Sequence, residues 1–125
     1  MGKLLVVDDD QNLRLLYKKE LEAVGHQITT AASAEEARQC FEKEKPELVV
    51  LDLKLTAEEG GLEALRWMRD YDPKIPIVIN TAYPAYKADF SSWLADAYIV
   101  KSGNLEELKA TINKLLSKNQ YGVLK

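Results

Sequence analysis

Short apolar runs that alternate with longer amphipathic segments are the feature that most constrains how this chain can fold. The runs lie at residues 4–7, 48–51, 75–79 and 98–100, with a weaker one at 27–32. Apart from the weaker run, they are continuously apolar and rich in Val, Ile and Leu, which is typical of strands that are covered on both faces of a parallel sheet. Each run therefore predicts a buried strand.

Five segments between and after these runs carry apolar residues at helical spacing. They span residues 11–24, 34–44, 62–71, 84–95 and 105–117. Ser33 with Glu36, and Asn104 with Glu107, have the spacing of a helix-capping box. Five repeats of strand and helix predict an α/β fold of the (βα)5 type, a doubly wound, five-stranded parallel sheet with right-handed crossovers.

Composition removes several classes of protein. The chain has 125 residues and a formal net charge of −3, which disfavours nucleic-acid binding through a basic surface. One cysteine, Cys40, cannot form an intramolecular disulfide, and Cys40 with His26 supplies too few ligands for a zinc site. No apolar run approaches the roughly 20 residues of a membrane span. We expect a cytoplasmic protein without membrane insertion, with one domain over residues 1–118, a short tail over 119–125 and no output domain.

Charged and polar side chains follow the predicted strands. Asp8, Asp9 and Asp10 follow the first strand, Asp52 ends the third, Asn80 and Thr81 end the fourth, and Lys101 ends the fifth. Ligands of open parallel sheets bind at these carboxyl ends. Carboxylates gathered there would repel one another without a cation, and hard oxygen ligands suit Mg²⁺. A carboxylate can also accept a phosphoryl group, so the pattern predicts a phosphoryl site, with Asp10 as a helix cap.

The sequence around these residues resembles the receiver domain of two-component response regulators. The segments that carry the resemblance are Leu-Val-Val-Asp8-Asp9, Val-Val-Leu-Asp52, Ile-Asn-Thr81-Ala82 and Tyr98-Ile-Val-Lys101. The resemblance extends over residues 3–117, and the four segments occur in the expected order. It implies a flavodoxin-like, CheY-like sheet with strand order 2-1-3-4-5, in a receiver of the stand-alone type.

The resemblance also implies roles for single residues. Asp52 would be the phosphoacceptor, and Asp9, Asp52 and the backbone carbonyl of Lys54 would hold Mg²⁺, with Asp8 acting mainly through water. Thr81 and Lys101 would contact the phosphoryl group, and Tyr98 would be a switch aromatic that follows Thr81.

In the family, the phosphoryl donor is a phosphohistidine of a sensor histidine kinase or a histidine phosphotransfer protein. The expected function is a phosphorylation-controlled protein–protein switch in two-component signalling, which acts on a downstream protein effector. Such a protein is not an enzyme beyond its own phosphorylation and dephosphorylation. The kinase is expected to meet the first helix near Leu13, and the output surface to lie on the fourth helix, fifth strand and fifth helix.

Some positions depart from the family pattern. Ser102 stands where proline usually follows a cis bond, and serine at this position favours a trans bond with an altered loop. The loop at residues 56–61 is one residue longer than usual. Lys54 and Tyr83 would flank the path of the hydrolytic water, so we expect slow autodephosphorylation. His26 follows Gly25 and is expected at the surface.

Two other functions stay open on the sequence alone. One is an interaction module that keeps the receiver fold without being phosphorylated, which Ser102 and the unusual loop mildly favour. The other is a small Mg²⁺-dependent phosphatase that acts through Asp8 or Asp52. A phosphatase of the haloacid-dehalogenase type is disfavoured, because Lys54 stands where its second aspartate is needed.

Overall fold

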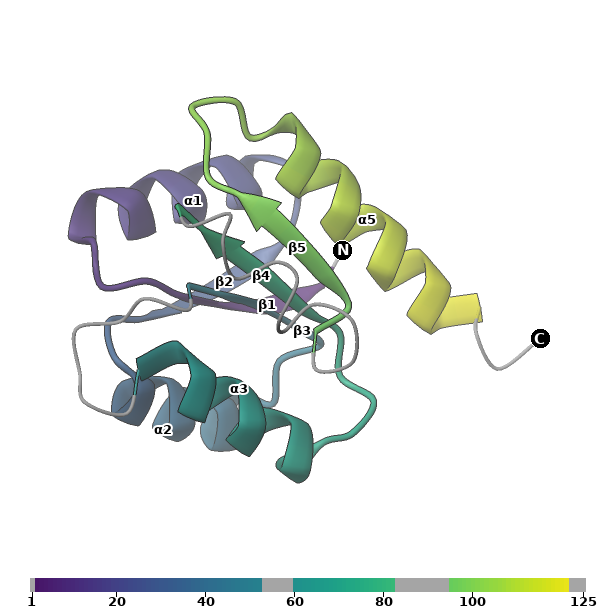
Figure 1. The fold of residues 1–125 in the computed structure, drawn as a ribbon. Helices are drawn as coiled ribbons and strands as arrows, with labels where there is room; N and C mark the ends of the chain where they lie inside the picture. Colours follow the sequence, from purple (N-terminus) through teal and green to yellow (C-terminus); the bar gives the residue numbers. More distant parts are fainter. Residues whose placement is uncertain (1, 53–59, 83–94, 122–125) are drawn as a thin grey trace.

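The computed structural model describes residues 2–52, 60–82 and 95–121, and within them it confirms the predicted α/β fold. The elements are β1 (Lys3–Val7), α1 (Gln11–Ala23), β2 (Gln27–Ala31), α2 (Ala34–Glu44), β3 (Leu48–Leu51), α3 (Gly60–Tyr71), β4 (Ile77–Thr81), β5 (Ala97–Val100) and α5 (Glu106–Tyr121). The five strands form one parallel sheet in the order β2-β1-β3-β4-β5, as expected. Helices α1 and α5 cover one face, and α2 and α3 cover the other (Figure 1). The helix predicted over 84–95 falls almost wholly outside the described residues.

Local capping explains where the described helices begin. The Asp10 carboxylate accepts hydrogen bonds from the backbone N–H groups of Asn12 and Leu13, so it caps α1 as predicted. The Ser33 hydroxyl accepts from the N–H of Glu36 at the start of α2. The last helix was predicted to end at residue 117, but α5 runs on to Tyr121.

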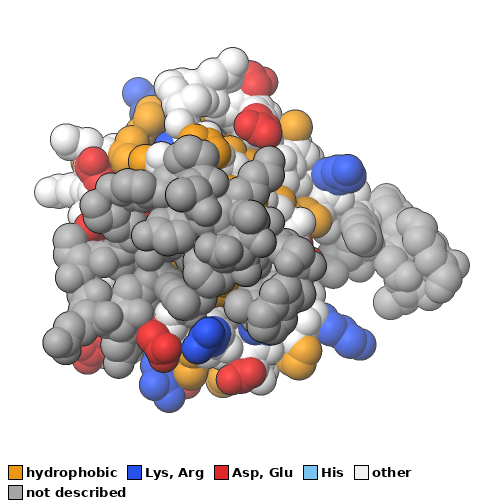
Figure 2. All heavy atoms as spheres, in the orientation of Figure 1, with side chains coloured by type: hydrophobic (Ala, Val, Ile, Leu, Met, Phe, Trp, Pro, Cys, Tyr) orange, Lys and Arg blue, Asp and Glu red, His pale blue; other side chains and the backbone are white. Residues whose placement is uncertain are grey.

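The three inner strands β1, β3 and β4 bury both of their faces, which explains why their sequences are apolar up to the strand ends, whereas the edge strands β2 and β5 are only partly buried. Leu4 and Val6 of β1 belong to a core cluster with residues of α1 and α5, whereas Leu5 and Val7 belong to a second cluster with residues of α2 and α3. Because side chains alternate along a strand, the next residue, Asp8, faces the α1/α5 side. None of the described helices is both long and apolar enough to cross a membrane. Figure 2 shows acidic and basic side chains interspersed on the visible part of the described surface.

His26 is buried, which corrects the expectation that it lies at the surface. Its side chain is 5% exposed, and its Nδ1 atom accepts a hydrogen bond from the N–H of Gly2 at 3.1 Å. Burial lowers the pKa of the imidazole, although hydrogen bonding with Asn113 of α5 opposes this shift. Gly25 indicated a turn at the surface. However, β2 begins at Gln27 and pairs with β1, which brings His26 against the start of the sheet. His26 therefore links the start of the sheet to α5.

The lowered pKa of His26 predicts a loss of stability at mildly acidic pH. A histidine in the unfolded chain binds its proton near pH 6.5, whereas folded His26 does so only at lower pH. The stability that neutral His26 confers is therefore complete above about pH 6.5 and is lost as the pH falls toward its folded pKa. In His26→Asn, which keeps a hydrogen-bond acceptor for Gly2, this loss should disappear.

Urea unfolding of both proteins between about pH 7.5 and about pH 5 measures the difference, with a slope of at most about 1.4 kcal/mol per pH unit for one proton. The carboxylates are common to the two proteins, so their titration cancels. Parallel pH profiles for the two proteins would contradict this role of His26.

Candidate functional site

The sheet register brings two buried carboxylates together. Val7 of β1 lies opposite Leu51 of β3, and Asp8 and Asp52 follow these two residues directly. The backbone N–H of Asp52 donates to the carbonyl of Val7 at 3.0 Å, which extends the pairing by one residue. Asp8 is 1% exposed and Asp52 is 5% exposed. The ends of β1 and β3 thus hold two carboxyl groups side by side, with little access to water.

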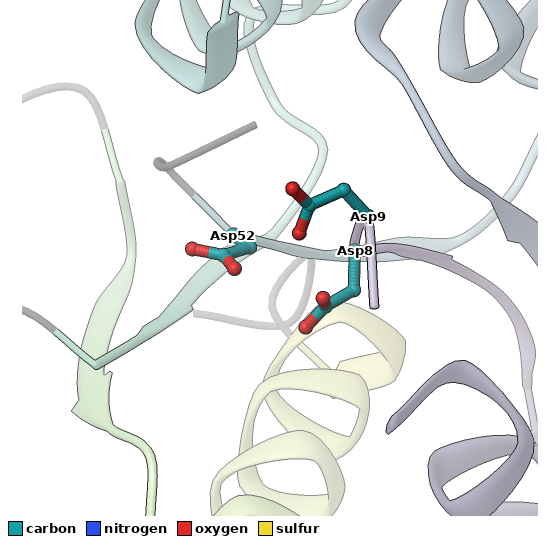
Figure 3. A group of neighbouring side chains, drawn as sticks. All are labelled: Asp8, Asp9 and Asp52. Carbon is teal, nitrogen blue, oxygen red and sulfur yellow. The ribbon is translucent and has the colours of Figure 1, made fainter. Parts of the chain in front are cut away.

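Asp9 completes an acidic cluster at this edge of the sheet. One carboxylate oxygen from each of Asp8, Asp9 and Asp52 lies within 4.8 Å of the others. Figure 3 shows the three side chains gathered there, with Asp9 projecting from the segment that follows β1. Three clustered carboxylates form a set of hard oxygen donors of the kind that Mg²⁺ takes with additional waters. The geometry therefore fits the magnesium site that the sequence predicted.

Lys101 bridges two of these carboxylates. Its Nζ atom lies 2.7 Å from Asp8 Oδ2 and 2.8 Å from Asp52 Oδ2. The backbone N–H of Lys101 donates to the carbonyl of Thr81 at 2.8 Å, which fixes the lysine at the end of β5. The site therefore joins the carboxyl ends of β1, β3 and β5 through one ammonium group.

Burial and charge act against each other in this cluster. Burial raises the pKa of Asp8, and the repulsion of Asp52 adds to the increase, while hydrogen bonds from Lys101 and Asp10 reduce it. Burial alone would lower the pKa of Lys101, but its hydrogen bonds and attraction to Asp52 and Asp8 outweigh this effect, and the pKa is raised. Lys101 is therefore positively charged at neutral pH and neutralises part of the carboxylate charge.

The segment between β1 and α1 is held by contacts that the sequence analysis did not foresee. The Asp8 carboxylate accepts from the N–H of Asp10 at 2.9 Å, and the Arg14 guanidinium donates to the Asp8 carbonyl at 2.8 Å. Both contacts fix the backbone that carries Asp9. The position of Arg14 one turn into a predicted helix was the only signal in the sequence, and it did not indicate the direction of the side chain.

Thr81 lies at the end of β4 and is fully buried. Its Oγ1 atom has no hydrogen-bond partner among the residues that the structure describes. Tyr98 is partly buried and packs against the α2/α3 side of the sheet. Lys54, Tyr83 and the loop at residues 56–59 lie outside the described residues.

Ser102 shapes the loop after Lys101. The described residues contain no cis peptide bond, so the Lys101–Ser102 bond is trans. The Ser102 hydroxyl donates to the carbonyl of Asn104 at 2.9 Å and accepts from its N–H at 3.3 Å. The Asn104 side chain in turn accepts from the N–H of Glu106 at 2.8 Å and caps α5. A closed polar turn therefore occupies the position where the family usually has proline.

Comparison with known proteins agrees with this geometry. The family model described as "Response regulator receiver domain" matches residues 4–113. The chain belongs to this family. The receiver domain is 33% identical over 121 residues to the "Virulence transcriptional regulatory protein PhoP" of Salmonella typhimurium, covering 95% of this chain and 54% of that protein. It thus spans about half the length of the curated relatives that it matches.

Solved structures of receiver proteins are also similar. The response regulator TrrA from Thermotoga maritima, in complex with Mg²⁺-BeF, is 43% identical, with a TM-score of 0.86 over 92% of this chain and 99% of that one. A structure of the histidine kinase ThkA in complex with TrrA matches with 43% identity and a TM-score of 0.84, covering 93% of this chain and 99% of that one. The chemotaxis protein CheY4 of Vibrio cholerae matches with 26% identity and a TM-score of 0.83, covering 92% of this chain and 98% of that one.

The acidic cluster predicts that Mg²⁺ stabilises this receiver domain. A ligand that binds only the folded state raises the midpoint of thermal unfolding by mass action. Asp9→Asn removes one carboxylate of the cluster, so we expect Mg²⁺ affinity to fall by about tenfold, equivalent to about 1.4 kcal/mol. The metal-free variant should be as stable as the wild type or more stable, because repulsion is relieved.

Thermal unfolding in a magnesium titration measures both effects. Asp10→Asn is the matched control, because Asp10 caps α1 from outside the cluster and asparagine is an equally good cap. The control should respond to Mg²⁺ like the wild type. An unchanged affinity in Asp9→Asn would remove Asp9 from the ligand set.

Proposed function

We propose that this receiver domain accepts a phosphoryl group on Asp52 from a phosphohistidine and so acts as a cytoplasmic protein–protein switch in two-component signalling. The observation that carries the proposal is the position of Asp52, which is buried beside two other carboxylates and contacts the ammonium group of Lys101 at 2.8 Å. An isolated buried aspartate would have no such counter-charge. The arrangement supplies both a nucleophilic oxygen and positive charge next to it.

The chemistry needs positioning and charge neutralisation more than acid–base catalysis. A carboxylate oxygen of Asp52 forms a bond to phosphorus while the bond from phosphorus to the donor's imidazole nitrogen breaks, and the imidazole leaves with the bonding electrons. Lys101 would hold the oxygens of the transferred group by charge-assisted hydrogen bonds. Asp8, Asp9 and Asp52 would hold Mg²⁺, with the Lys54 carbonyl as a further ligand from outside the described residues. The bound ion would supply additional positive charge near the phosphoryl oxygens.

Thr81 is suited to report phosphorylation. Its hydroxyl is buried without a hydrogen-bond partner among the described residues, and a buried polar group in that state is unfavourable. A phosphoryl oxygen on Asp52 would offer it an acceptor. We propose that Thr81 turns to that oxygen and that Tyr98 changes position with it, which shifts an existing equilibrium toward the active conformation.

The face of α1 that borders the site is proposed as the docking surface for the phosphohistidine partner. Leu15 and Leu16 are 59% and 40% exposed, whereas Leu13, near which the sequence placed the contact, packs against the core. A depression of about 450 Å³ lies beside Leu16, between α1 and the start of α5. The kinase ThkA forms a complex with TrrA, the relative of similar fold, which supports a kinase partner here. The fourth helix, part of the proposed output surface, lies outside the described residues.

The two alternative functions find less support. An interaction module without phosphorylation does not need the contacts of Lys101 with both Asp8 and Asp52, since buried charges are expensive to retain. A phosphatase would need a second group to activate water beside its nucleophile. Asp8, which lies beside Asp52, is held in an ion pair with Lys101 at 2.7 Å and is therefore poorly suited to that role.

Asp52→Asn tests the proposal. Asparagine nearly keeps the shape of the side chain but lacks the nucleophilic carboxylate, so phosphorylation should be abolished while the fold survives. The measurement is the intact mass after incubation with acetyl phosphate and Mg²⁺, followed by peptide mapping of the modified residue. The wild type should gain one phosphoryl group that base removes and mild acid does not. Asp10→Asn serves as the folded control and should be modified like the wild type.

Three other outcomes would each contradict the proposed function. A wild-type protein of unchanged mass would support the interaction module. Continuous release of phosphate from many substrates would support the phosphatase. Full modification of Asp52→Asn at another residue would show that Asp52 is not the acceptor.

A further inference from the structure

A buried polar pair lies beside the acidic site, and the function proposed above does not use it. Leu51 of β3 lies opposite Ile79 of β4, so Asp52 and Asn80 are the next residues on the two strands. In the same way, Asp8 and Asp52 follow the paired residues Val7 and Leu51 on β1 and β3. Asp8, Asp52 and Asn80 therefore stand level on three adjacent strands. Asn80 is 4% exposed.

Asn80 faces the same side of the sheet as the two carboxylates. Val78, two residues before it, belongs to the core cluster on the α1/α5 side, and side chains alternate along a strand. On that side the Asn80 side chain hydrogen bonds with Tyr17 of α1, whose own side chain is 2% exposed. The phenol and the amide are thus hydrogen-bond partners inside the core.

Both side chains adjoin an otherwise apolar core cluster. The other buried residues of this cluster are Leu, Val and Ile, and β4 itself reads Ile-Val-Ile before Asn80. A valine at position 80 and a phenylalanine at position 17 would fill the same space without buried polar atoms. The polar pair therefore has a role that packing alone does not explain.

The pair of Tyr17 and Asn80 lies next to Lys101 of the acidic site. Ile99 of β5 lies opposite Asn80, and Lys101 follows two residues later on the same face. The lysine reaches Asp52 and Asp8 from there, so its side chain crosses the end of β4 above Asn80. Burial raises the pKa of the Tyr17 hydroxyl, and the positive charge of Lys101 acts in the opposite direction.

We propose that Tyr17 and Asn80 are positioning residues that hold the ammonium group of Lys101 between Asp8 and Asp52. The inference rests on the proposed phosphorylation of Asp52. The pair places polar groups next to the lysine side chain. With apolar groups there instead, the ammonium group would take a different position between the two carboxylates. Small displacements of a charged group in a phosphoryl-transfer site slow the reaction strongly.

The test separates positioning from stability by removing both polar groups together. Tyr17→Phe/Asn80→Val removes both partners of this hydrogen bond together, so neither is left buried without the other, and the midpoint of thermal unfolding should equal or exceed that of the wild type. The maximal rate of phosphorylation by acetyl phosphate in saturating Mg²⁺ should nevertheless fall by about tenfold. Tyr71→Phe, which removes an exposed hydroxyl on α3, is the control and should leave the rate unchanged.

A double-mutant cycle shows whether the pair acts through Lys101. In a Lys101→Met background, the same two substitutions should change the residual rate by less than about twofold, because the group that they position is gone. A wild-type rate in the folded double variant would overturn the inference, as would an equal loss in the two backgrounds. If the double variant does not fold, Tyr17→Phe alone is measured in the same cycle with the same criteria. A wild type that gains no phosphoryl group on Asp52 would instead overturn the proposed function.

Discussion

The contact of one ammonium group with two buried carboxylates is the interaction on which the site depends. Lys101 lies within 2.8 Å of both Asp8 and Asp52, and these carboxylates are almost inaccessible to water. Removing the lysine from such a cluster would leave two buried carboxylates without a counter-charge, and breaking a buried ion pair in this way typically costs about 3–5 kcal/mol. The two strands that carry the carboxylates and the strand that carries the lysine must therefore end at the same edge of the sheet. Parallel strands in the order found here meet that condition.

The register of the strands brings the charged residues to the same edge of the sheet. Pairing of Val7 with Leu51 places the two carboxylates side by side, and the alternation of side chains turns both toward α1 and α5. A shift by one residue would turn Asp52 toward the opposite layer and bury Leu51 on the wrong side. The hydrophobic pattern that stabilises the two core layers thus also fixes the geometry of the polar site.

The sequence was sufficient to predict the features that follow from periodicity and strand ends. The alternation of strands and helices, the grouping of Asp8, Asp9, Asp52 and Lys101, and the caps at Asp10, Ser33 and Asn104 all depend on neighbours in the chain or on the ends of apolar runs. The strand order does not, and it was expected only from the resemblance to the receiver family. The positions of His26 and Arg14 depend on elements far along the chain, or on the direction of a side chain. His26 was misplaced because its burial comes from Gly2 and Asn113, which no local pattern connects to it. The pairing of Tyr17 with Asn80 has the same origin, although an asparagine directly after a run of Val and Ile was a visible sign of a polar contact at the strand end.

The end of β4 is polar although the rest of the strand is apolar. Asn80 and Thr81 occupy the last two positions of a central strand whose other residues are apolar, and they project to opposite sides of the sheet. Asn80 has a partner in Tyr17, whereas the Thr81 hydroxyl has none among the described residues. One residue is thus fixed and its neighbour is left with an unmet hydrogen bond. A strand end that is held on one side and unsatisfied on the other can respond to a new acceptor on Asp52 without losing its place in the sheet, which is the property that a phosphorylation switch requires.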